Sequence, residues 1–166
     1  TGNGAGNGRN IAIGDDTQFA DVDDDRSIII GHNTTGKGDN QTIIRGNGGI
    51  YNSQNSTTWD TTSDERIKKN IVNNNTGLDI LNQIQVRNFE YRTEEEIVDF
   101  SNPKAALVEK SGVQIGTIAQ EIEKILPEIV TESSIGVKSV DTDPLLWYLI
   151  NAVKELSAKV TALEAG

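Results

Sequence analysis

The sequence contains no cysteine and no methionine, and its only histidine is His32. Without cysteine the chain can form neither a disulfide nor a thiolate metal site. One histidine supplies too few nitrogen ligands for an ordinary zinc site. A Ser-His-Asp triad could form only if His32 were its histidine. We therefore expect neither a resident metal nor a cofactor.

Aromatic residues make up only 5% of the 166 residues, and all hydrophobic residues together 35%. A single copy could bury only a modest core, and small cores often depend on association with other copies. The formal net charge of -10 argues against nucleic-acid binding, which requires a basic face. The sequence has no apolar run of about 18 residues, so we expect no membrane-spanning helix.

Residues 1–60 are rich in Gly, Asn, Asp and Thr, and one short pattern recurs within them. It is a run of β-branched residues closed by glycine. Regular short strands between turn residues are typical of repetitive β-structure. In such a structure each layer buries its apolar side chains by stacking on neighbouring layers or by packing against other chains. Three unrelated edge strands in an ordinary β-domain are the alternative. The copies occupy residues 9–14, 26–31 and 41–46, with starting points 17 and then 15 residues apart.

Residues 64–166 have a different character, with short pieces of both helical and strand-like pattern. Alternation of apolar and polar residues predicts strands, whereas spacings of three and four predict helices. Pro127 is expected to end one of these helices. The expected elements are short helices within 67–84 and at 119–126, strands at 86–92, 113–118 and 137–140, and a loop at 101–112.

The last segment predicts one long helix that begins at Asp143 and Pro144, since proline is favoured at the first helical position. Its apolar residues follow spacings of 3, 4, 3, 4 and 3, which is the seam of a coiled coil just under three heptads long. An isolated helix of this length is marginal in water, so it must pack on copies of itself or on its own domain. The pattern leaves open whether copies would form a dimer or a trimer. The seam residues are Leu146, Leu149, Val153, Leu156, Val160 and Leu163.

Two loop motifs are similar to ligand sites but lack essential residues. Residues 31–38 approach a phosphate-binding loop, but Gly38 replaces the magnesium-binding hydroxyl, and a strand-like segment follows where a helix is required. Residues 21–25 could offer carboxylates to calcium, yet they lack the glycine and the distal glutamate of an EF-hand loop. Turns between repeats explain both motifs better.

Hydroxyl groups, acids and lysines follow one another as TTSDERIKKN, residues 61–70, where the two halves meet. Thr62 and Glu65 have the spacing of a capping box, with Asp64 near the positive end of a helix. The segment also holds Ser63 and a lysine five residues later, and a neutral lysine amine can activate a serine hydroxyl. Burial or neighbouring cations would favour that neutral amine.

Three stretches of the second half resemble the intramolecular chaperone domain at the C-terminus of phage tail spikes and tail fibres, the endosialidase-type chaperone or peptidase S74 family. They are residues 63–71, residues 116–123 with 126–130, and residues 149–156. Their order and approximate spacing are similar to that family across residues 63–166. The repeats before Ser63 resemble, more loosely, the shaft of a trimeric fibre.

The resemblance implies a mixed fold, in which a repetitive β fibre segment of the trimeric β-helix or β-prism kind precedes an α+β chaperone domain ending in a coiled-coil-forming helix. The expected domains are a fibre end at 1–62, the chaperone domain at 63–142 and the trimerising helix at 143–166. The resemblance also implies a homotrimer whose folding client is its own fibre segment. Such a protein belongs to the virion, in a tail fibre or spike assembled in the host cytoplasm. Neither nucleic acid nor membrane is an expected partner, and the full-length fibre could bind a host receptor.

The resemblance further implies a single-turnover serine autoprotease that cuts its own chain at the junction of Ser63 and Asp64 and releases the chaperone domain. Ser63 matches the family's serine, and Lys68 matches the lysine that activates it. Residues five apart on a regular helix lie about 140° apart around its axis. Ser63 must therefore lie on a turn before the helix, or meet a lysine of another chain.

Ring geometry alone favours a different bond. Attack of Ser63 on its own carbonyl would close a strained four-membered ring, whereas attack on the Thr62 carbonyl closes a five-membered ring and cuts before Ser63. A serine from another chain, or an activated water, could cut after it. The scissile bond therefore stays open at this stage.

Two other functions are compatible with the same residues. A permanent trimerisation tip would share the fold and never be cut. A receptor- or glycan-binding fibre end would use exposed aromatic residues, of which Tyr51 and Trp59 lie close to the boundary. Detection of cleavage, or of glycan binding by residues 1–63, distinguishes these functions from a self-releasing chaperone.

Overall fold

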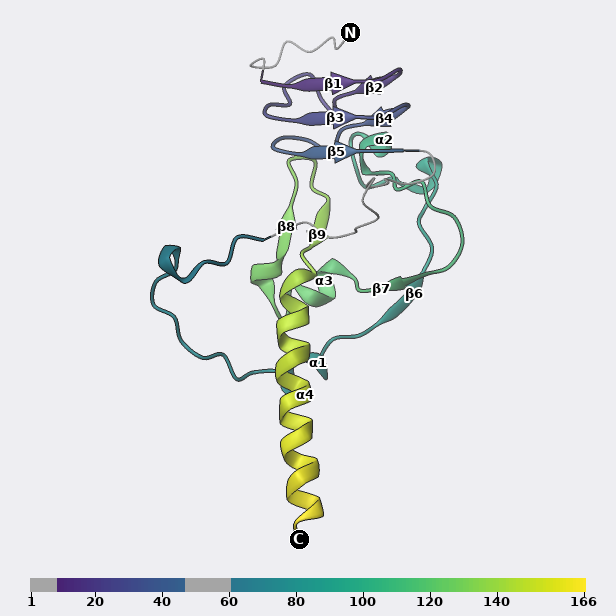
Figure 1. Ribbon diagram of the computed structural model, residues 1–166. Helices are drawn as coiled ribbons and strands as arrows, with labels where there is room; N and C mark the ends of the chain where they lie inside the picture. Colours follow the sequence, from purple (N-terminus) through teal and green to yellow (C-terminus); the bar gives the residue numbers. More distant parts are fainter. Residues whose placement is uncertain (1–8, 47–60) are drawn as a thin grey trace.

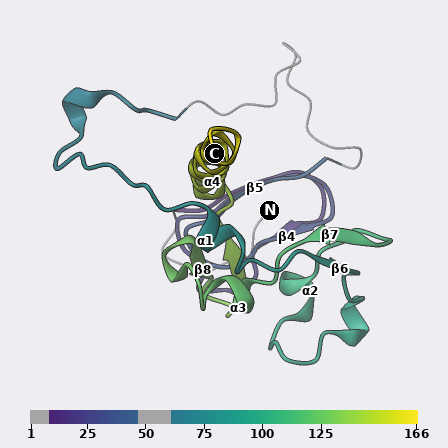
Figure 2. The same ribbon diagram turned by 90° about the horizontal axis from the view of Figure 1, so that it is seen from below.

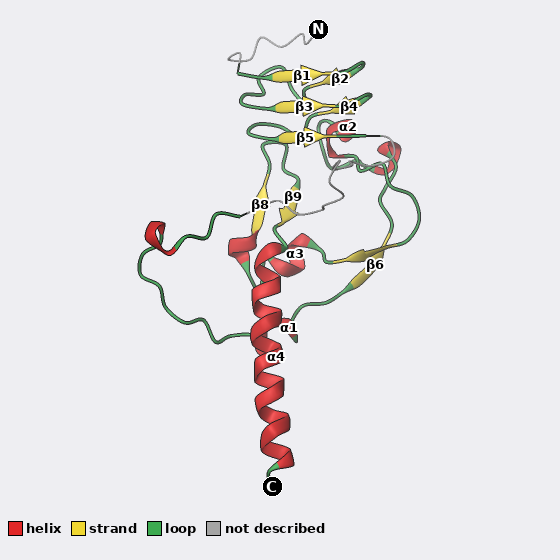
Figure 3. Cartoon of the chain, viewed as in Figure 1, coloured by secondary structure: helices red, strands yellow, loops and turns green. Residues whose placement is uncertain are grey.

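The computed structural model describes residues 9–46 and 61–166 (Figure 1). A stack of short strands comes first, small helices and antiparallel strand pairs follow, and a long helix points away from the stack to the C-terminus (Figures 1 and 3). The expected mixed α/β class with a long last helix is therefore confirmed. Tyr51 and Trp59 lie outside the described residues.

The sequence repeats stack as parallel strands in register. Three strands form one sheet in the order β1-β3-β5, and a second pair, β2-β4, lies beside it. Each layer is too short to enclose a core by itself, and Ile29 of the middle layer has 0% of its surface exposed. Burial in this part of the chain therefore depends on stacking. The strands are β1 (Ile11–Ile13), β2 (Thr17–Gln18), β3 (Ile28–Ile30), β4 (Thr34–Thr35) and β5 (Thr42–Ile44).

The third repeat pairs one residue earlier than the glycine-closed pattern predicts. That pattern aligned Ile43 with Ile28, but in the structure Thr42 faces Ile28 and Ile43 faces Ile29. A shift of one residue turns every side chain of a strand to the opposite face. The observed register places Ile43 in line with buried Ile29, which keeps apolar side chains of successive layers together.

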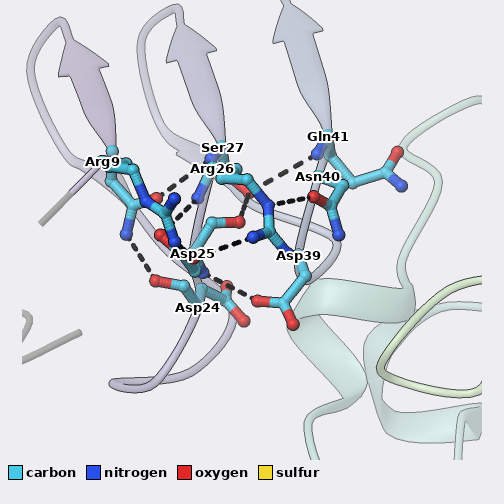
Figure 4. Close-up of polar contacts among 9 residues, drawn as sticks. Arg9, Asp24, Asp25, Arg26, Ser27, Asp39, Asn40 and Gln41 are labelled. Atoms are coloured by element: carbon cyan, nitrogen blue, oxygen red, sulfur yellow. Dashed lines mark hydrogen bonds and ion pairs between the residues drawn. The ribbon is translucent and has the colours of Figure 1, made fainter. Parts of the chain in front are cut away.

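Polar side chains link the layers where the strands begin (Figure 4). Ser27 is buried, and its Oγ donates to the carbonyl oxygen of Gly38 at 2.8 Å. The backbone N–H of Asp25 donates to Asp39 Oδ1 at 2.7 Å, and Arg9 Nη2 lies 2.6 Å from Asp25 Oδ2. Hydrogen bonds at the edge of the stack therefore supplement the burial of isoleucine in its interior.

A small core forms below the stack. Ile122, Leu126 and Ile129 are buried there, and partly buried side chains from the strands and the last helix pack against them.

The predicted helix at 119–126 is α-helical only at α3 (Ala119–Ile122), and Pro127 opens the single turn η3 (Pro127–Ile129). The predicted strand at 137–140 is β9 (Lys138–Val140), which pairs antiparallel with β8 (Val130–Glu132).

The predicted loop at 101–112 is partly wrong, because α2 (Pro103–Ala106) lies within it. Asn102 caps this helix by accepting from the Ala105 N–H at 3.1 Å, and proline occupies the first helical position. The helix belongs to a long connection between two antiparallel strands that were both predicted. The connection also holds η2 (Glu94–Glu96), and the strands are β6 (Arg87–Phe89) and β7 (Gln114–Gly116).

The long helix α4 (Asp143–Glu164) begins at the predicted Asp143 and Pro144. The short helix α1 (Leu78–Leu81) packs on it, and Gly77 makes this approach possible: a Cβ there would lie 2.2 Å from the Ala152 nitrogen. A view along α4 shows α1, α3 and β8 gathered beside it (Figure 2). Across residues 9–46 and 61–166, no helix is both long and apolar enough to cross a membrane.

Candidate functional site

Ser63 and Lys68 meet on an exposed segment, residues 61–76, termed the arm below. Lys68 Nζ donates to Ser63 Oγ at 2.6 Å. Between them lies the single turn η1 (Glu65–Ile67), after which Lys68 already has extended backbone. Ser63 thus precedes the helical turn, which is the arrangement that the spacing requires for contact within one chain. The structure brings the two predicted site residues together, and their catalytic role stays a prediction.

Asp64 builds the turn that joins these two residues. Its Oδ1 accepts from the Arg66 N–H at 2.9 Å, which makes Asp64 the N-cap. The Arg66 guanidinium folds back onto the same carboxylate, with Nε 3.0 Å from Oδ1. Both bonds lower the pKa of Asp64 below its ordinary value, and the bond from the Arg66 side chain has the larger effect. The predicted capping box of Thr62 and Glu65 is wrong, because the ionised side chain of Asp64 takes the cap position.

The arm is exposed along its length. Both Ser63 and Lys68 are exposed, as are three apolar side chains further along, Ile67 at 69%, Ile71 at 65% and Val72 at 84%. A lysine amine takes a proton from serine only when it is neutral, and burial favours that form. A single copy therefore supplies the contact between the two groups but not the burial.

Helix α4 fixes the base of the arm. Asn151 Nδ2 donates to the carbonyl oxygens of Asn74 at 2.9 Å and Thr76 at 3.1 Å. Next to it, Gly77 lies directly against Ala152. The arm starts from this fixed point and curves away from α4 (Figures 1 and 2). A side chain of the long helix therefore holds the base of the arm.

A second group of contacts joins the strand stack to the rest of the chain. Lys37 Nζ donates to the carbonyl oxygens of Ala105 and Leu107 at the end of α2, at 3.1 and 3.2 Å. Burial lowers the pKa of Lys37. At the start of α2, Asn102 Nδ2 donates to the Ala20 carbonyl oxygen at 2.5 Å. Both ends of α2 are therefore tied to the stack.

No sequence pattern indicated a role for Asn102 or Asn151. Lys37 lies in the near match to a phosphate-binding loop, between Gly36 and Gly38. The structure gives that lysine another role, because its amine points to the carbonyl oxygens of α2. Polar side chains that bind backbone at a distant position leave no periodic pattern in a sequence.

The other candidate ligand residues have structural partners. Asp24 of the acidic loop is buried, and its Oδ2 accepts from the N–H groups of Ala20 at 2.8 Å and Asp21 at 3.2 Å. It therefore closes a turn between repeats. His32 is exposed, with Nδ1 3.5 Å from Asp15 Oδ2. Within the part of the chain that the structure describes, no three His, Asp or Glu side chains are grouped to hold a metal ion.

Comparison with known families identifies the segment that contains the arm. Residues 63–131 match the family model Peptidase_S74, described as chaperone of endosialidase. The match begins at Ser63 and ends within β8, so it covers the arm from Ser63 onward, α1, β6, α2, β7 and α3. No curated protein sequence matches the chain.

Proposed function

Because residues 63–131 carry a chaperone domain of the peptidase S74 family, we propose that this domain folds the strand stack before it and then releases itself by cutting the chain at Ser63. The proposed setting is the end of a trimeric phage tail fibre or spike, divided into a fibre end at 1–62, the chaperone domain at 63–142 and a trimerising helix at 143–166. The observation that supports release most directly is the 2.6 Å contact between Lys68 Nζ and Ser63 Oγ, at the first residues of the family match.

The proposed chemistry uses these two side chains, a backbone carbonyl and one water. Neutral Lys68 takes the proton of the Ser63 hydroxyl while the oxygen adds to the carbonyl carbon. The tetrahedral intermediate then expels the backbone nitrogen, which receives the proton from the Lys68 ammonium and becomes the new N-terminus. An ester remains, and water hydrolyses it to a carboxylate and the original serine hydroxyl.

Two bonds are candidates for this attack. The family resemblance favours the Ser63–Asp64 bond, with the attacking oxygen supplied by the serine of a second chain, or by an activated water that gives the carboxylate directly without an ester. Attack of Ser63 on the Thr62 carbonyl would instead close a five-membered ring and cut before Ser63. The released domain then begins with Asp64 or with Ser63, and its mass, which differs by one serine residue, distinguishes the two.

Association of copies is supported by apolar side chains that one copy leaves in water. Every predicted seam residue of α4 is about half exposed or more, from Leu156 at 49% to Leu163 at 82%. The outer side of the strand stack likewise presents Ile13 at 56%, Ile30 at 36% and Ile44 at 42%. Packing of three copies along both faces would remove this surface from water, which is favourable.

A denaturing gel with intact mass spectrometry tests the release. The proposal expects two fragments that meet at residue 63 in the wild type, and one full-length band in Ser63→Ala and in Lys68→Ala. Thr61→Ala, an exposed hydroxyl of the same segment, is the control and should be cut as the wild type is. A single full-length band in the folded wild type would overturn self-release.

A permanent, uncut trimerisation tip is the second candidate. The contacts of Lys37 with Ala105 of α2 and of Asn102 with Ala20 of the stack favour it, because they would continue to hold the two halves together after a cut. The denaturing gel identifies an uncut tip by its single full-length band, and size-exclusion chromatography of any cut material shows whether the domain is released. A releasing chaperone predicts that the stack elutes apart from residues 64–166 and remains trimeric, since an intertwined fibre persists through its unfolding barrier. Co-elution of the halves would show a domain that stays bound after the cut and would contradict release.

A further inference from the structure

A pocket with positively charged walls lies between the strand stack and the connection that carries α2. It has a volume of about 250 Å³. Its cations come from three separate segments, since Lys37 follows β4, Arg45 follows β5 and Lys104 belongs to α2. Glu109 is the one acid among its lining residues. Three cations and one carboxylate leave the lining with two net positive charges, although the whole chain has a formal net charge of -10.

The charge of Lys37 is not neutralised by the chain. Its Nζ donates to the carbonyl oxygens of Ala105 and Leu107, but neutral carbonyl groups leave the positive charge in place. Among the residues that the structure describes, neither Lys37 nor Lys104 forms an ion pair. Partial burial lowers the pKa of Lys37, because its cation loses hydration there. An ammonium has three N–H donors, and the two carbonyl contacts use only two of them.

Arg45 already holds a carboxylate in this pocket. Its Nη1 donates to the Asn33 carbonyl oxygen at 2.9 Å, and its Nη2 pairs with the carboxylate of Glu109. A guanidinium has five N–H donors in one plane, so these contacts leave others for a ligand. The Glu109 side chain is 46% exposed, and an exposed ion pair of this kind is weak. A ligand with more negative charge can therefore displace Glu109 from Arg45.

The fold holds the three cations together. Asn102 ties the start of α2 to the Ala20 carbonyl oxygen, and Lys37 ties its end to the stack. Like charges that share a half-buried place repel one another, and an anion bound between them turns this repulsion into attraction. The pocket therefore has the charge, the donors and the fixed walls that a small anion requires.

We propose that this pocket binds a small dianion that carries phosphate or carboxylate groups, held by Lys37, Arg45 and Lys104. Two negative charges on the ligand match the two net positive charges of the lining. Two of the cations belong to the stack and the third to α2, so the bound anion also joins the two halves of the chain. The site contains neither Ser63 nor Lys68 and does not depend on the proposed self-cleavage.

Isothermal titration calorimetry of the full-length Ser63→Ala chain tests the binding, with inorganic phosphate and succinate as the probes. Sodium chloride keeps the ionic strength constant, so that general screening does not imitate a site. The proposal expects saturable binding of one anion per chain, and the anion that binds should also raise the midpoint of thermal unfolding. Binding of phosphate alone or of succinate alone identifies the group that the pocket prefers. Saturable binding of neither probe would overturn the proposal.

A pair of lysine variants locates the site. Lys104→Met should weaken binding by about tenfold or more, as expected for the loss of one hydrogen bond between charged groups. Lys110→Met removes the same charge from an exposed lysine of the same connection that does not line the pocket, and it should bind as the parent chain does. Equal affinities in both variants would overturn the assignment of the anion to this pocket.

Glu109→Gln tests the displacement at Arg45. It removes the chain's own carboxylate and should tighten binding by about two- to fivefold, given the usual strength of an exposed ion pair. A variant that fails to fold cannot bind more tightly, so this result decides even where Lys104→Met is unstable. Unchanged or weaker binding in Glu109→Gln would contradict a ligand at Arg45.

Discussion

Lys37 Nζ lies 3.1 Å from the carbonyl oxygen of Ala105, although the two residues are 68 positions apart in the sequence. The last carbonyl groups of a helix have no partner within it, and here a lysine of the strand stack supplies one for α2. Because Asn102 binds the Ala20 carbonyl from the other end of the same helix, α2 spans two successive turns of the stack. The second half of the chain therefore contacts two stacked layers rather than a single strand.

Replacement of Lys37 by methionine should therefore weaken the joint between the halves. Two carbonyl oxygens lose their donor in a partly buried place, which costs about 1 to 3 kcal/mol. Urea unfolding of an uncut Ser63→Ala background gives the free energy of unfolding directly. Lys110→Met, an exposed lysine on the same connection, is the control, and an equal loss in both variants would show that the contact of Lys37 has no special weight.

The two faces of the strand stack should respond differently to truncation. Ile29→Ala removes a side chain with 0% exposure and should lower the free energy of unfolding by about 2 to 5 kcal/mol. Ile30 is 36% exposed, so Ile30→Ala should lower it less in a single copy and chiefly weaken association. Urea unfolding and sedimentation equilibrium measure the two effects. Equal effects of the two variants on both quantities would contradict the assignment of an inner and an outer face.

Low pH should weaken the turn that positions Ser63 and Lys68. The pKa of Asp64 is held below its ordinary value, first by the side-chain bond from Arg66. An acid whose pKa is lowered by folding stabilises the fold above its unfolded pKa, and this contribution is lost as pH falls through the folded pKa. The cap is therefore complete at neutral pH and is lost only at pH values below the usual aspartate range.

An NMR titration of the Asp64 carboxyl carbon in the Ser63→Ala chain measures this shift. The midpoint should rise in Arg66→Gln, which removes the charged partner, and the difference should shrink at high salt because the pair is exposed. The same midpoint with and without Arg66 would contradict the role of Arg66.

The sequence pattern was sufficient for elements whose signals are local. The start of α4 followed from Asp143 and Pro144, and the repeats at β1, β3 and β5 followed from their β-branched runs. The register of β5 did not follow, because glycine at the end of a repeat is a weaker constraint than the burial of Ile43 in line with Ile29. The short helix α2 was missed although Asn102 and Pro103 are a local start signal, because the helix has only four residues and its packing depends on the distant stack.

The candidate site was likewise predictable from the sequence only in part. The motif supplied Ser63 and Lys68, and the resemblance supplied their roles. The turn that brings them together depends on Asp64 and Arg66. The capping-box pattern put Asp64 near the positive end of a helix but gave the cap to Thr62, and it gave Arg66 no part in the turn. The anchoring of the arm by Asn151 crosses more than 70 residues of sequence, and no local pattern announces such a bond.

The central claim is that one particular lysine activates Ser63, and a matched pair of variants tests it most directly. Lys68 and Lys69 are adjacent and both exposed, but Lys68 is the one whose Nζ contacts Ser63 Oγ, at 2.6 Å. Intact mass spectrometry of freshly folded wild type, Lys68→Ala and Lys69→Ala should show two fragments in the wild type and in Lys69→Ala, and a full-length chain in Lys68→Ala. Cleavage of Lys68→Ala at the wild-type rate would contradict the account.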